Sequence, residues 1–334
     1  MDPLSQGMLG SVGATQASQT KHLGIATLLG FASGLTPDLD ILIKSATDPL
    51  IALEYHRQFT HSLVYIPLGG LLCAVLFYFL FARKHLSFKQ TYLFCTLGIA
   101  THALLDAFTT YGTQLFWPFS DMRVAFNTIS IIDPLFTLPL LLLIVINLKF
   151  KRRLIAVATL VWALFYLSLG FIQRERAEAA GWALANERGL EVTKLEAKPS
   201  FANLLVWKIV TSTQEKYYVD AIKVGRSGTA VFEGASVQKF DIDRDLPWLD
   251  KSSQQAKDIE RFRWFSNGYL AMSPTQENTI IDMRYSMLPN EVKGLWGIRL
   301  DPNANPEQHI EYIESTERSP KTFKQLWQMI AHPL

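Results

Sequence analysis

The chain has 334 residues, enough for two domains, and a formal net charge of only +2. This near balance of basic and acidic side chains gives no indication of a nucleic-acid partner. The charges are unevenly distributed, because residues 1–172 hold 11 basic and 8 acidic side chains whereas residues 173–334 hold 21 and 22. The composition therefore predicts an apolar domain over residues 1–172 and an ordinary soluble domain over residues 173–334.

Apolar runs divide the first domain into segments of a length that can cross a bilayer. Three runs contain at most one charged residue each, and two others are interrupted by polar side chains. In chain order the five runs are Leu23–Ile43, Leu63–Ala82, Tyr92–Leu105 with an extension to Phe108, Ile129–Leu148 and Leu154–Gln173. We therefore predict an α-helical multi-pass membrane domain with about five spans, followed by a small soluble α+β domain.

Lys and Arg concentrate in alternate connections of this five-span arrangement, and such connections remain in the cytoplasm. With the lysine before the first span included, 8 basic residues lie on that side and 3 on the other. The sequence therefore predicts that the start of the chain lies inside and that residues 174–334 lie outside the cytoplasm.

Seven metal-capable residues accompany the spans, although ionisable side chains in a membrane carry a high energetic cost. They are Asp38, Asp40, His56, His61, His102, Asp106 and Asp133. The five-span arrangement places all seven at the outer face of the membrane. His102 and Asp106 are four residues apart and share one face of a helix. A gathering at one face is what a single site requires.

Imidazoles and carboxylates without a thiolate suit zinc, manganese or iron, and the two cysteines lie inside apolar runs. We expect a divalent metal ion, with zinc preferred over manganese and iron. A metal of this kind lowers the pKa of a bound water to about 7 and polarises a phosphoryl or carbonyl oxygen. The expected ligands are Asp38, Asp40, His56, His61, His102 and Asp106.

Three residues are expected to act in catalysis. Asp40 and Asp133 are carboxylates that can serve as a general base or support a ligand, and the planar guanidinium of Arg57 suits a phosphate. Structural alternatives stay open, because Arg57 can instead pair with a carboxylate or a lipid headgroup. Asp133 can also cap the helix that begins at Pro134.

Five ordered motifs resemble a bacterial family of inner-membrane metal-dependent hydrolases, also called LexA-binding, inner-membrane-associated hydrolases. The resemblance covers about residues 1–150. The motifs are Met1-Asp2-Pro3-Leu4, Pro37-Asp38-Leu39-Asp40, His56-Arg57 with Thr60-His61-Ser62, His102 and Asp106 with Thr110-Tyr111-Gly112-Thr113, and Asp133-Pro134-Leu135. The resemblance implies an integral protein of the bacterial inner membrane and a metal-dependent hydrolase that uses these His and Asp residues as metal ligands. It does not extend to residues 174–334, whose expected periplasmic location rests on the five-span arrangement.

One position departs from the family pattern. Many members carry Thr-His near the N-terminus, where this chain has Ser5-Gln6. If that histidine is a ligand in other members, Gln6 removes it here. His22 could substitute, but the five-span arrangement places it on the opposite side of the membrane.

The second domain begins as a helix that continues from the last span over Gln173–Glu187. Strands are expected at Leu204–Thr211, Tyr217–Lys223, Thr229–Phe232, Asn278–Met283 and Leu295–Leu300, and helices at Lys257–Phe265 and Thr322–Ala331. This alternation predicts a small α+β domain. A lid, a substrate-recognition module and a partner module remain open as its role.

These observations favour a metal-dependent hydrolase that acts at the outer face on an ester or phosphoester of a lipid or amphiphile. Membrane lipid is its expected partner, no nucleic acid is expected, and no protein partner is indicated. A metal or ion transporter is an alternative, although it would place polar residues through the whole membrane depth. A structural or regulatory protein held together by a metal is a second alternative, favoured by a closed coordination shell.

Overall fold

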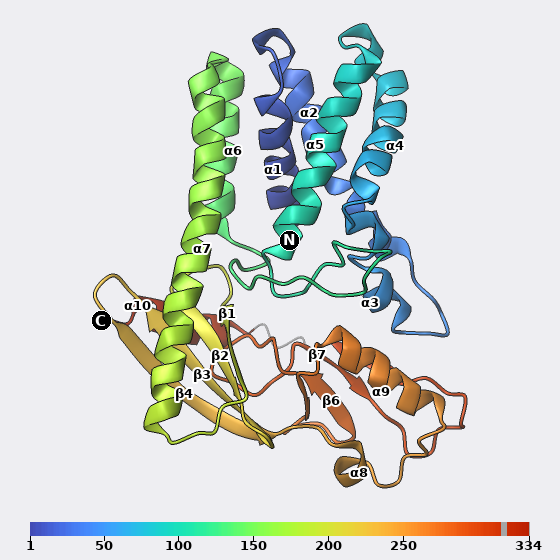
Figure 1. Ribbon diagram of the computed structural model, residues 1–334, viewed down its shortest axis with the longest axis vertical. Coiled ribbons are helices and arrows are strands. Elements are labelled where there is room, and N and C mark those ends of the chain that lie inside the picture. The colour runs from blue at the N-terminus through green and yellow to red at the C-terminus, as the bar shows by residue number, and fades with distance from the viewer. Residues whose placement is uncertain (315–318, 334) are drawn as a thin grey trace. The chain divides into compact units, whose positions relative to one another are not determined.

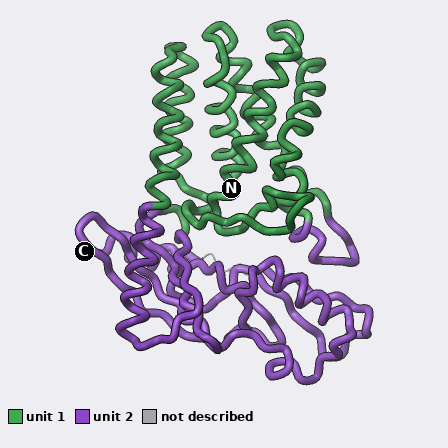
Figure 2. Tube along the Cα trace, in the orientation of Figure 1, with its two compact units in different colours: residues 1–43, 55–171, 201–203 green, residues 44–54, 172–200, 204–334 purple. Residues whose placement is uncertain are grey.

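The computed structural model describes residues 1–314 and 319–333, which form two compact units (Figure 2). Unit 1 comprises residues 1–43, 55–171 and 201–203, and unit 2 comprises residues 44–54, 172–200 and 204–334. The short segment 44–54 therefore clusters with unit 2, although it connects two motif-bearing segments of unit 1. Nothing in the sequence pattern indicates this exchange.

Unit 1 is a bundle of helices that lie side by side along most of their length (Figure 1). Its long helices are α1 (Pro3–Gln16), α2 (Leu23–Leu35), α4 (Tyr65–Leu80), α5 (Phe88–Ala107), α6 (Pro134–Phe150) and the first part of α7 (Arg153–Glu187). Short helical turns join them: η1 (Thr20–His22), η2 (Pro37–Leu42), η3 (Phe59–His61) and η4 (Ala82–Lys84). The short helix α3 (Ile51–Tyr55) lies almost wholly in the segment 44–54 that clusters with unit 2. The first unit of the chain is thus helical, as predicted.

Local sequence explains where these helices begin. Asp2 caps α1 through a bond from the Ser5 backbone N–H, and Pro3 occupies the first helical position. Asp133 and Pro134 start α6 in the same way. These caps satisfy backbone donors that would otherwise be exposed inside an apolar bundle.

Helices α1, α2 and α5 approach one another through small residues. A Cβ atom on Gly30 would lie 2.3 Å from the Gly10 carbonyl oxygen, and one on Gly98 would lie 2.2 Å from Ser33 Oγ. Only glycine permits backbones at this separation, which is a common device for packing helices in membranes. The close contact of α2 with α5 sets η2, which follows α2, against the end of α5.

Two helical segments are long and apolar enough to cross a membrane by length and composition, within residues 1–314 and 319–333. They are Thr20–Leu42 and Arg153–Glu187, and a third results if Ile51–His61 and Tyr65–Leu80, bent by 84°, count as one span. The predicted count of about five spans is not supported. Its physical basis is weak because α4 and α6 hold only 16 and 17 residues.

Helix α1 changes the predicted position of the start of the chain. The Met1 amine contacts the Asp106 side chain, and Asp2 N–H donates to the Ile131 carbonyl oxygen at 2.9 Å. At the other end of α1, Arg153 Nη1 donates to the Gln16 carbonyl oxygen at 2.6 Å. Met1 therefore lies at the same end of the bundle as Asp106. The predicted location of the chain start, at the end opposite Asp106, is wrong because α1 is an additional helix that runs along the bundle before α2.

Unit 2 is an α+β region with two antiparallel four-stranded sheets. The first sheet has the order β1 (Lys194–Pro199), β2 (Val206–Ser212), β3 (Lys216–Val224) and β4 (Thr229–Gln238). The second has the order β5 (Leu270–Met272), β6 (Thr279–Asp282), β7 (Trp296–Arg299) and β8 (Glu311–Glu314). The helices of unit 2 are the end of α7, α8 (Ile242–Asp245), α9 (Gln254–Phe265) and α10 (Pro320–Ala331).

The predicted α+β class is confirmed, and the apolar face of each sheet explains why. Val210 and Val219 of the first sheet pack in one buried core with Ala271 and Ile281 of the second sheet and with Tyr269, which directly precedes β5. The strands β1, β5 and β8 were not predicted. Strand β5 has only three residues and β8 only four, too few to show the alternation of apolar and polar residues that indicates a strand. Strand β1 is rich in Lys and Glu, which hides that alternation.

Candidate metal centre

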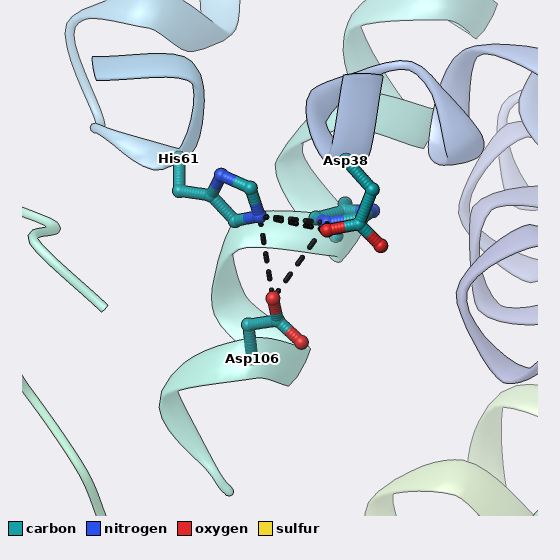
Figure 3. A group of neighbouring side chains, drawn as sticks. Asp38, His61 and Asp106 are labelled. Carbon is teal, nitrogen blue, oxygen red and sulfur yellow. Dashed lines mark hydrogen bonds and ion pairs between the residues drawn. The ribbon is translucent and has the colours of Figure 1, made fainter. Parts of the chain in front are cut away.

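Four side chains from three separate elements converge at one end of unit 1 (Figure 3). Asp38 comes from η2, His61 from η3, and His102 and Asp106 from α5. We call these residues the four-residue cluster. Helix α2 ends before Pro37, and the tight turn that follows directs Asp38 toward α5.

The donor atoms of the cluster lie close together. His61 Nε2 is 3.4 Å from Asp38 Oδ1, 3.3 Å from Asp106 Oδ2 and 2.9 Å from His102 Nε2. His102 Nε2 is 3.4 Å from Asp38 Oδ1 and 3.7 Å from Asp106 Oδ2. One atom from each residue therefore faces a shared centre.

The hydrogen-bonding pattern of the cluster leaves acceptor lone pairs facing its centre. His102 Nδ1 lies 2.6 Å from the Gly34 carbonyl oxygen, which can only accept, so Nδ1 carries the hydrogen. In the neutral ring Nε2 then presents a lone pair to the centre. Asp38 Oδ1 and Asp106 Oδ2 are buried and accept no hydrogen bond of good geometry among the residues that the structure describes, although Asp106 Oδ2 forms an ion pair with Arg57 Nε at 2.9 Å. Buried polar atoms without partners are costly and call for an explanation.

A metal ion fits this arrangement. Bonds of 2.0–2.1 Å from a tetrahedral zinc to N and O donors place neighbouring donors about 3.3–3.4 Å apart. The five separations that involve His61 or His102 run from 2.9 to 3.7 Å and so bracket that distance, and all four donor atoms lie within 4.8 Å of one another. The bond from His102 Nδ1 to a backbone carbonyl is also how metal-bound histidines are usually oriented. The cluster could therefore hold a divalent ion.

Asp40 lies beside the cluster and organises the loop that carries His61. Its Oδ2 accepts hydrogen bonds from Arg57 N–H at 3.0 Å and from Thr60 Oγ1 at 2.8 Å. Its Oδ1 is 2.7 Å from His56 Nδ1, and Oδ2 is 3.3 Å from His61 Nδ1. Asp38, Asp40 and His56 form a second group whose ligand atoms lie within 4.8 Å of one another. Both oxygens of Asp40 thus already have partners.

Arg57 is buried against the cluster rather than open to solvent. Its Nε is 2.9 Å from Asp106 Oδ2, and its Nη1 donates to Thr109 Oγ1 at 2.8 Å. The guanidinium also lies 4.7 Å from the ring centre of Tyr111. The backbone of Arg57 is left-handed, with φ of 62°, which turns the chain back toward Asp40. The arrangement matches the ion pair with a carboxylate that the sequence left open.

Gln6 also belongs to the surroundings of the cluster. Its Nε2 donates to Asp106 Oδ1 at 2.7 Å, and its side chain is buried. Together with the Met1 amine it holds the oxygen of Asp106 that faces away from the centre. Sequence reasoning noticed Gln6 only as a departure from the family pattern, and that departure was the available signal.

Asp133 lies apart from the two groups. It accepts backbone bonds from Leu135 and Phe136 at the start of α6, and the Tyr166 hydroxyl donates to it at 2.8 Å. Among residues 1–314 and 319–333, neither group with metal-ligand geometry includes Asp133. The structure therefore brings Asp38, Asp40, His56, Arg57, His61, His102 and Asp106 together, and leaves Asp133 as a helix cap.

Comparison with known proteins agrees with the sequence motifs. Residues 1–177 match the family described as YdjM inner membrane protein. The chain is 31% identical over 110 residues to the uncharacterized protein YfhP of Bacillus subtilis (strain 168), which covers 33% of this chain and 32% of YfhP. It is 33% identical over 98 residues to the inner membrane protein YbcI of Escherichia coli (strain K12), which covers 28% of this chain and 54% of YbcI.

The matches thus span about a third of YfhP and about half of YbcI, and no solved structure matches the chain. The family match contains every residue of the four-residue cluster, together with Asp40, His56 and Arg57. The predicted resemblance to a family of inner-membrane proteins is confirmed, and so is the inner membrane as the location. The chain belongs to the YdjM inner membrane protein family.

Proposed function

We propose that this protein is a metal-dependent hydrolase of the inner membrane, and that the four-residue cluster holds one divalent ion, zinc first. The observation that carries the proposal is the convergence of four donor atoms in one buried group. Two of them are carboxylate oxygens that accept no hydrogen bond of good geometry in the described residues, and one of these, Asp106 Oδ2, is ion-paired with Arg57. Removing Asp38 or His102 leaves the remaining donors without a complete set. A soluble helix bundle would bury apolar side chains at such a point instead.

A bound divalent ion would polarise a carbonyl or phosphoryl oxygen and lower the pKa of water. Near it, His56 is the residue best placed to move a proton, because Asp40 holds its Nδ1 at 2.7 Å and its side chain is 21% exposed. Arg57 balances the charge of Asp106 and keeps that carboxylate in place. In this proposal Asp40 orients His56 and His61, and Asp133 supports the fold of α6.

The substrate is proposed to be an ester or phosphoester of a lipid or other amphiphile. The exposed side of the site is formed by His56 and by Asp38, whose side chain is 24% exposed. Since the chain belongs to an inner-membrane family, a site at the end of the helix bundle lies at headgroup depth if the helices cross the bilayer. Lipid-linked substrates reach that depth within the membrane, whereas a soluble substrate must displace lipid headgroups to reach the site.

The basic connections support an orientation with the site outside the cytoplasm. Eight Lys and Arg residues lie in the connections and adjoining helix ends at the far end of unit 1, and three lie in the connections near the site. We propose that the remaining helices of unit 1 also lie in the membrane and that residues 174–334 are periplasmic. Labelling of Ser227→Cys by a membrane-impermeant maleimide in intact spheroplasts tests this orientation. Labelling only after lysis would place unit 2 in the cytoplasm.

A second function is favoured by the closed geometry of the cluster. Four protein donors fill a tetrahedral shell, and structural zinc sites are usually filled in this way. The ion would then tie η2, η3 and α5 together without catalysis. The variant His56→Ala distinguishes the two functions. If it loses hydrolysis but keeps the metal, the protein is an enzyme. If neither the wild type nor the variant hydrolyses a substrate although both hold the metal, the ion is structural.

Metal content decides the proposal first. Elemental mass spectrometry of detergent-purified protein should find about one equivalent of zinc, manganese or iron in the wild type. His102→Ala and Asp38→Ala should both lose it, because they remove donors from different elements of one centre. His85→Ala, which changes an exposed histidine outside the cluster, is the matched control and should keep it. Wild-type protein that binds no metal after reconstitution would overturn both functions.

Hydrolysis is tested with the metal-loaded protein. Phosphatidylglycerol, phosphatidylethanolamine and a soluble phosphomonoester in matched mixed micelles separate lipid from soluble substrates. The proposal predicts turnover of at least one lipid, lost in His56→Ala and Asp38→Ala. Turnover of the soluble ester alone would contradict the amphiphilic substrate.

A further inference from the structure

The connections at the end of unit 1 away from the cluster form a second site. A cavity of about 740 Å³ lies among the α1–α2, α4–α5 and α6–α7 connections. The size falls within the range of small-molecule sites. Its polar lining is basic: Lys21, His22, Lys84, His85 and Lys151.

No Asp or Glu lines the cavity within the described residues. The positive charge of the three lysines is therefore not neutralised by a carboxylate of the lining, and it is available to attract an anionic ligand. Lysine ammonium groups suit a phosphate as point charges. An anion with a phosphate diester or monoester is the ligand that this lining fits best.

The rest of the lining is largely apolar and continues onto helix α2. It includes Leu23, Ile25 and Leu28 of α2 together with Phe81 and Leu148. Leu28 is 52% exposed, and it belongs to the candidate span Thr20–Leu42. A free phosphate makes no favourable contact with these apolar side chains. A phospholipid, by contrast, can place its acyl chain along α2 and its phosphate among the lysines.

A neighbouring small cavity supplies an acceptor. It shares Thr20, Leu23 and Lys151 with the larger one and is also lined by Asn147. Asn147 is 5% exposed, and its Oδ1 has no hydrogen-bond partner in the part of the chain that the structure describes. A hydroxyl on the headgroup would satisfy this oxygen.

We propose that this cavity binds an anionic phospholipid with a hydroxyl-bearing headgroup, of which phosphatidylglycerol is the natural probe. The site is independent of the proposed hydrolase activity and lies at the other end of the bundle from the four-residue cluster. Basic pockets between membrane helices are a known way of holding anionic lipids. The lipid would tie three connections of the bundle together at the headgroup level.

The test uses native mass spectrometry of the full chain released from detergent with added phosphatidylglycerol or phosphatidylcholine. The cavity variant is Lys21→Gln, Lys84→Gln, Lys151→Asn; asparagine is chosen because residue 151 has φ of 51°. The matched control, Arg83→Gln, Lys89→Gln, Lys149→Asn, removes the same charge from exposed residues at the same end of the bundle that do not line the cavity; they lie in or next to the α4–α5 and α6–α7 connections.

The wild type and the control should retain phosphatidylglycerol in preference to phosphatidylcholine. The cavity variant should lose at least tenfold in phosphatidylglycerol affinity, since each lysine near a lipid surface contributes roughly fivefold. Equal loss in both variants would show diffuse surface attraction and overturn the site. Equal retention in all three proteins would also overturn it.

Two further arms keep the result clear. Glycerol phosphate, the headgroup without acyl chains, should bind at least tenfold more weakly; equal binding would make the cavity a site for soluble phosphate esters. If the triple variant does not fold, judged by circular dichroism, Lys84→Gln is compared with Arg83→Gln in the same assay. No difference between these two would count against the cavity.

Discussion

His102 is fixed at both of its ring nitrogens, which makes it the anchor of the cluster. Nδ1 is 2.6 Å from the Gly34 carbonyl oxygen on α2, and Nε2 faces the other three donors. Its position therefore depends on the contact between two helices rather than on a flexible loop. A ligand built on rigid elements is held more accurately than one on a loop. His61, which ends the short helical turn η3, depends on Asp40 for the same purpose.

Asp40→Asn should weaken metal binding without abolishing it. The amide removes a negative charge beside His56 and His61 and disturbs the two bonds to Arg57 N–H and Thr60 Oγ1. Loss of such an outer partner typically lowers metal affinity about 10–100-fold. Competition with a chelator should show this shift, while Asp38→Asn should lose the ion.

Thr60→Ser keeps the hydroxyl and serves as the control, with affinity close to the wild type. If Asp40→Asn lost the metal as completely as Asp38→Asn, Asp40 would be a ligand itself. The distinction matters because the sequence alone could not separate the two aspartates of Pro37-Asp38-Leu39-Asp40. They are two residues apart, and only the fold shows that one faces the centre and the other faces the loop.

Spacing predicted part of the candidate site because it acts within one element. His102 and Asp106 share a helix face for a geometric reason, and both join the cluster. The position of Asp133 could not be read in this way, since its distance from α5 depends on how α6 packs. Gln6 was missed because glutamine is not a usual metal ligand, and its contact with Asp106 spans 100 residues of sequence.

Lys208 should make the stability of unit 2 depend on pH. It is buried on β2, where it donates to Ser286 Oγ at 2.8 Å and to the Glu291 carbonyl oxygen at 3.0 Å. Burial lowers the pKa of Lys208 to about 7. The unfolded chain therefore binds more protons than the folded chain between pH 7 and about 10.5, so stability rises with pH across that window.

The expected effect is a higher melting temperature at pH 9 than at pH 7 for detergent-purified protein. Lys208→Met removes the titrating group and should flatten this dependence. The change corresponds to a few kcal/mol at most. Lys257→Met, on the exposed face of α9, is the control and should leave the slope unchanged. A wild-type melting temperature that falls between pH 7 and 9 would contradict the buried neutral lysine.

At the scale of elements, the bundle depends on glycines that admit a neighbouring backbone. Gly10 and Gly30 face each other across α1 and α2, and Gly98 faces Ser33 across α2 and α5. Helix α1 was not predicted, because its glycines and serines give it little apolar character. These same small residues are what allow it to pack. The rule that identifies long apolar spans thus misses a short helix whose stability comes from close contact.

Gly30→Ala should destabilise the bundle. Its Cβ would lie 2.3 Å from the Gly10 carbonyl oxygen and 2.7 Å from Ala14 Cβ, so α1 and α2 must separate. Overpacking of this kind costs about 1–3 kcal/mol. Gly24→Ala on the same helix is the matched control, since a Cβ there meets nothing within 4 Å. Thermal melting in detergent should separate the two variants, and equal melting temperatures would show that the helices do not pack so closely.

At the scale of the whole molecule, the segment 44–54 links the two units in sequence. It belongs to unit 2 by its contacts, yet Ile43 and Tyr55 at its ends belong to unit 1. Asp40 precedes it and His56 follows it. The chain between two parts of the candidate site is therefore held by the other unit, a topology that hydropathy and motif spacing cannot reveal.

Arg261 of α9 holds this segment. Its Nη2 donates to Asp48 Oδ2 at 2.8 Å, its Nε donates to Glu54, and its Nη1 donates to Asp258 at 2.9 Å. Burial alone would raise the pKa of Asp48, but the bond from Arg261 and its charge bring that pKa below its ordinary value. The segment also buries Leu50, so its release exposes apolar surface as well as charge.

Arg261→Gln should therefore loosen residues 44–54 while the rest of the fold stays intact. Charge-assisted bonds at partly exposed sites are worth about 1–2 kcal/mol together, enough to speed local opening several-fold. Hydrogen exchange followed by mass spectrometry should show faster exchange in peptides that cover this segment. Arg263→Gln on the same helix, whose partner Glu260 is exposed, should not show it. Because the segment joins Asp40 to His56, metal affinity should fall with Arg261→Gln and not with Arg263→Gln; unchanged affinity despite faster exchange would mean that unit 2 holds the segment without supporting the site.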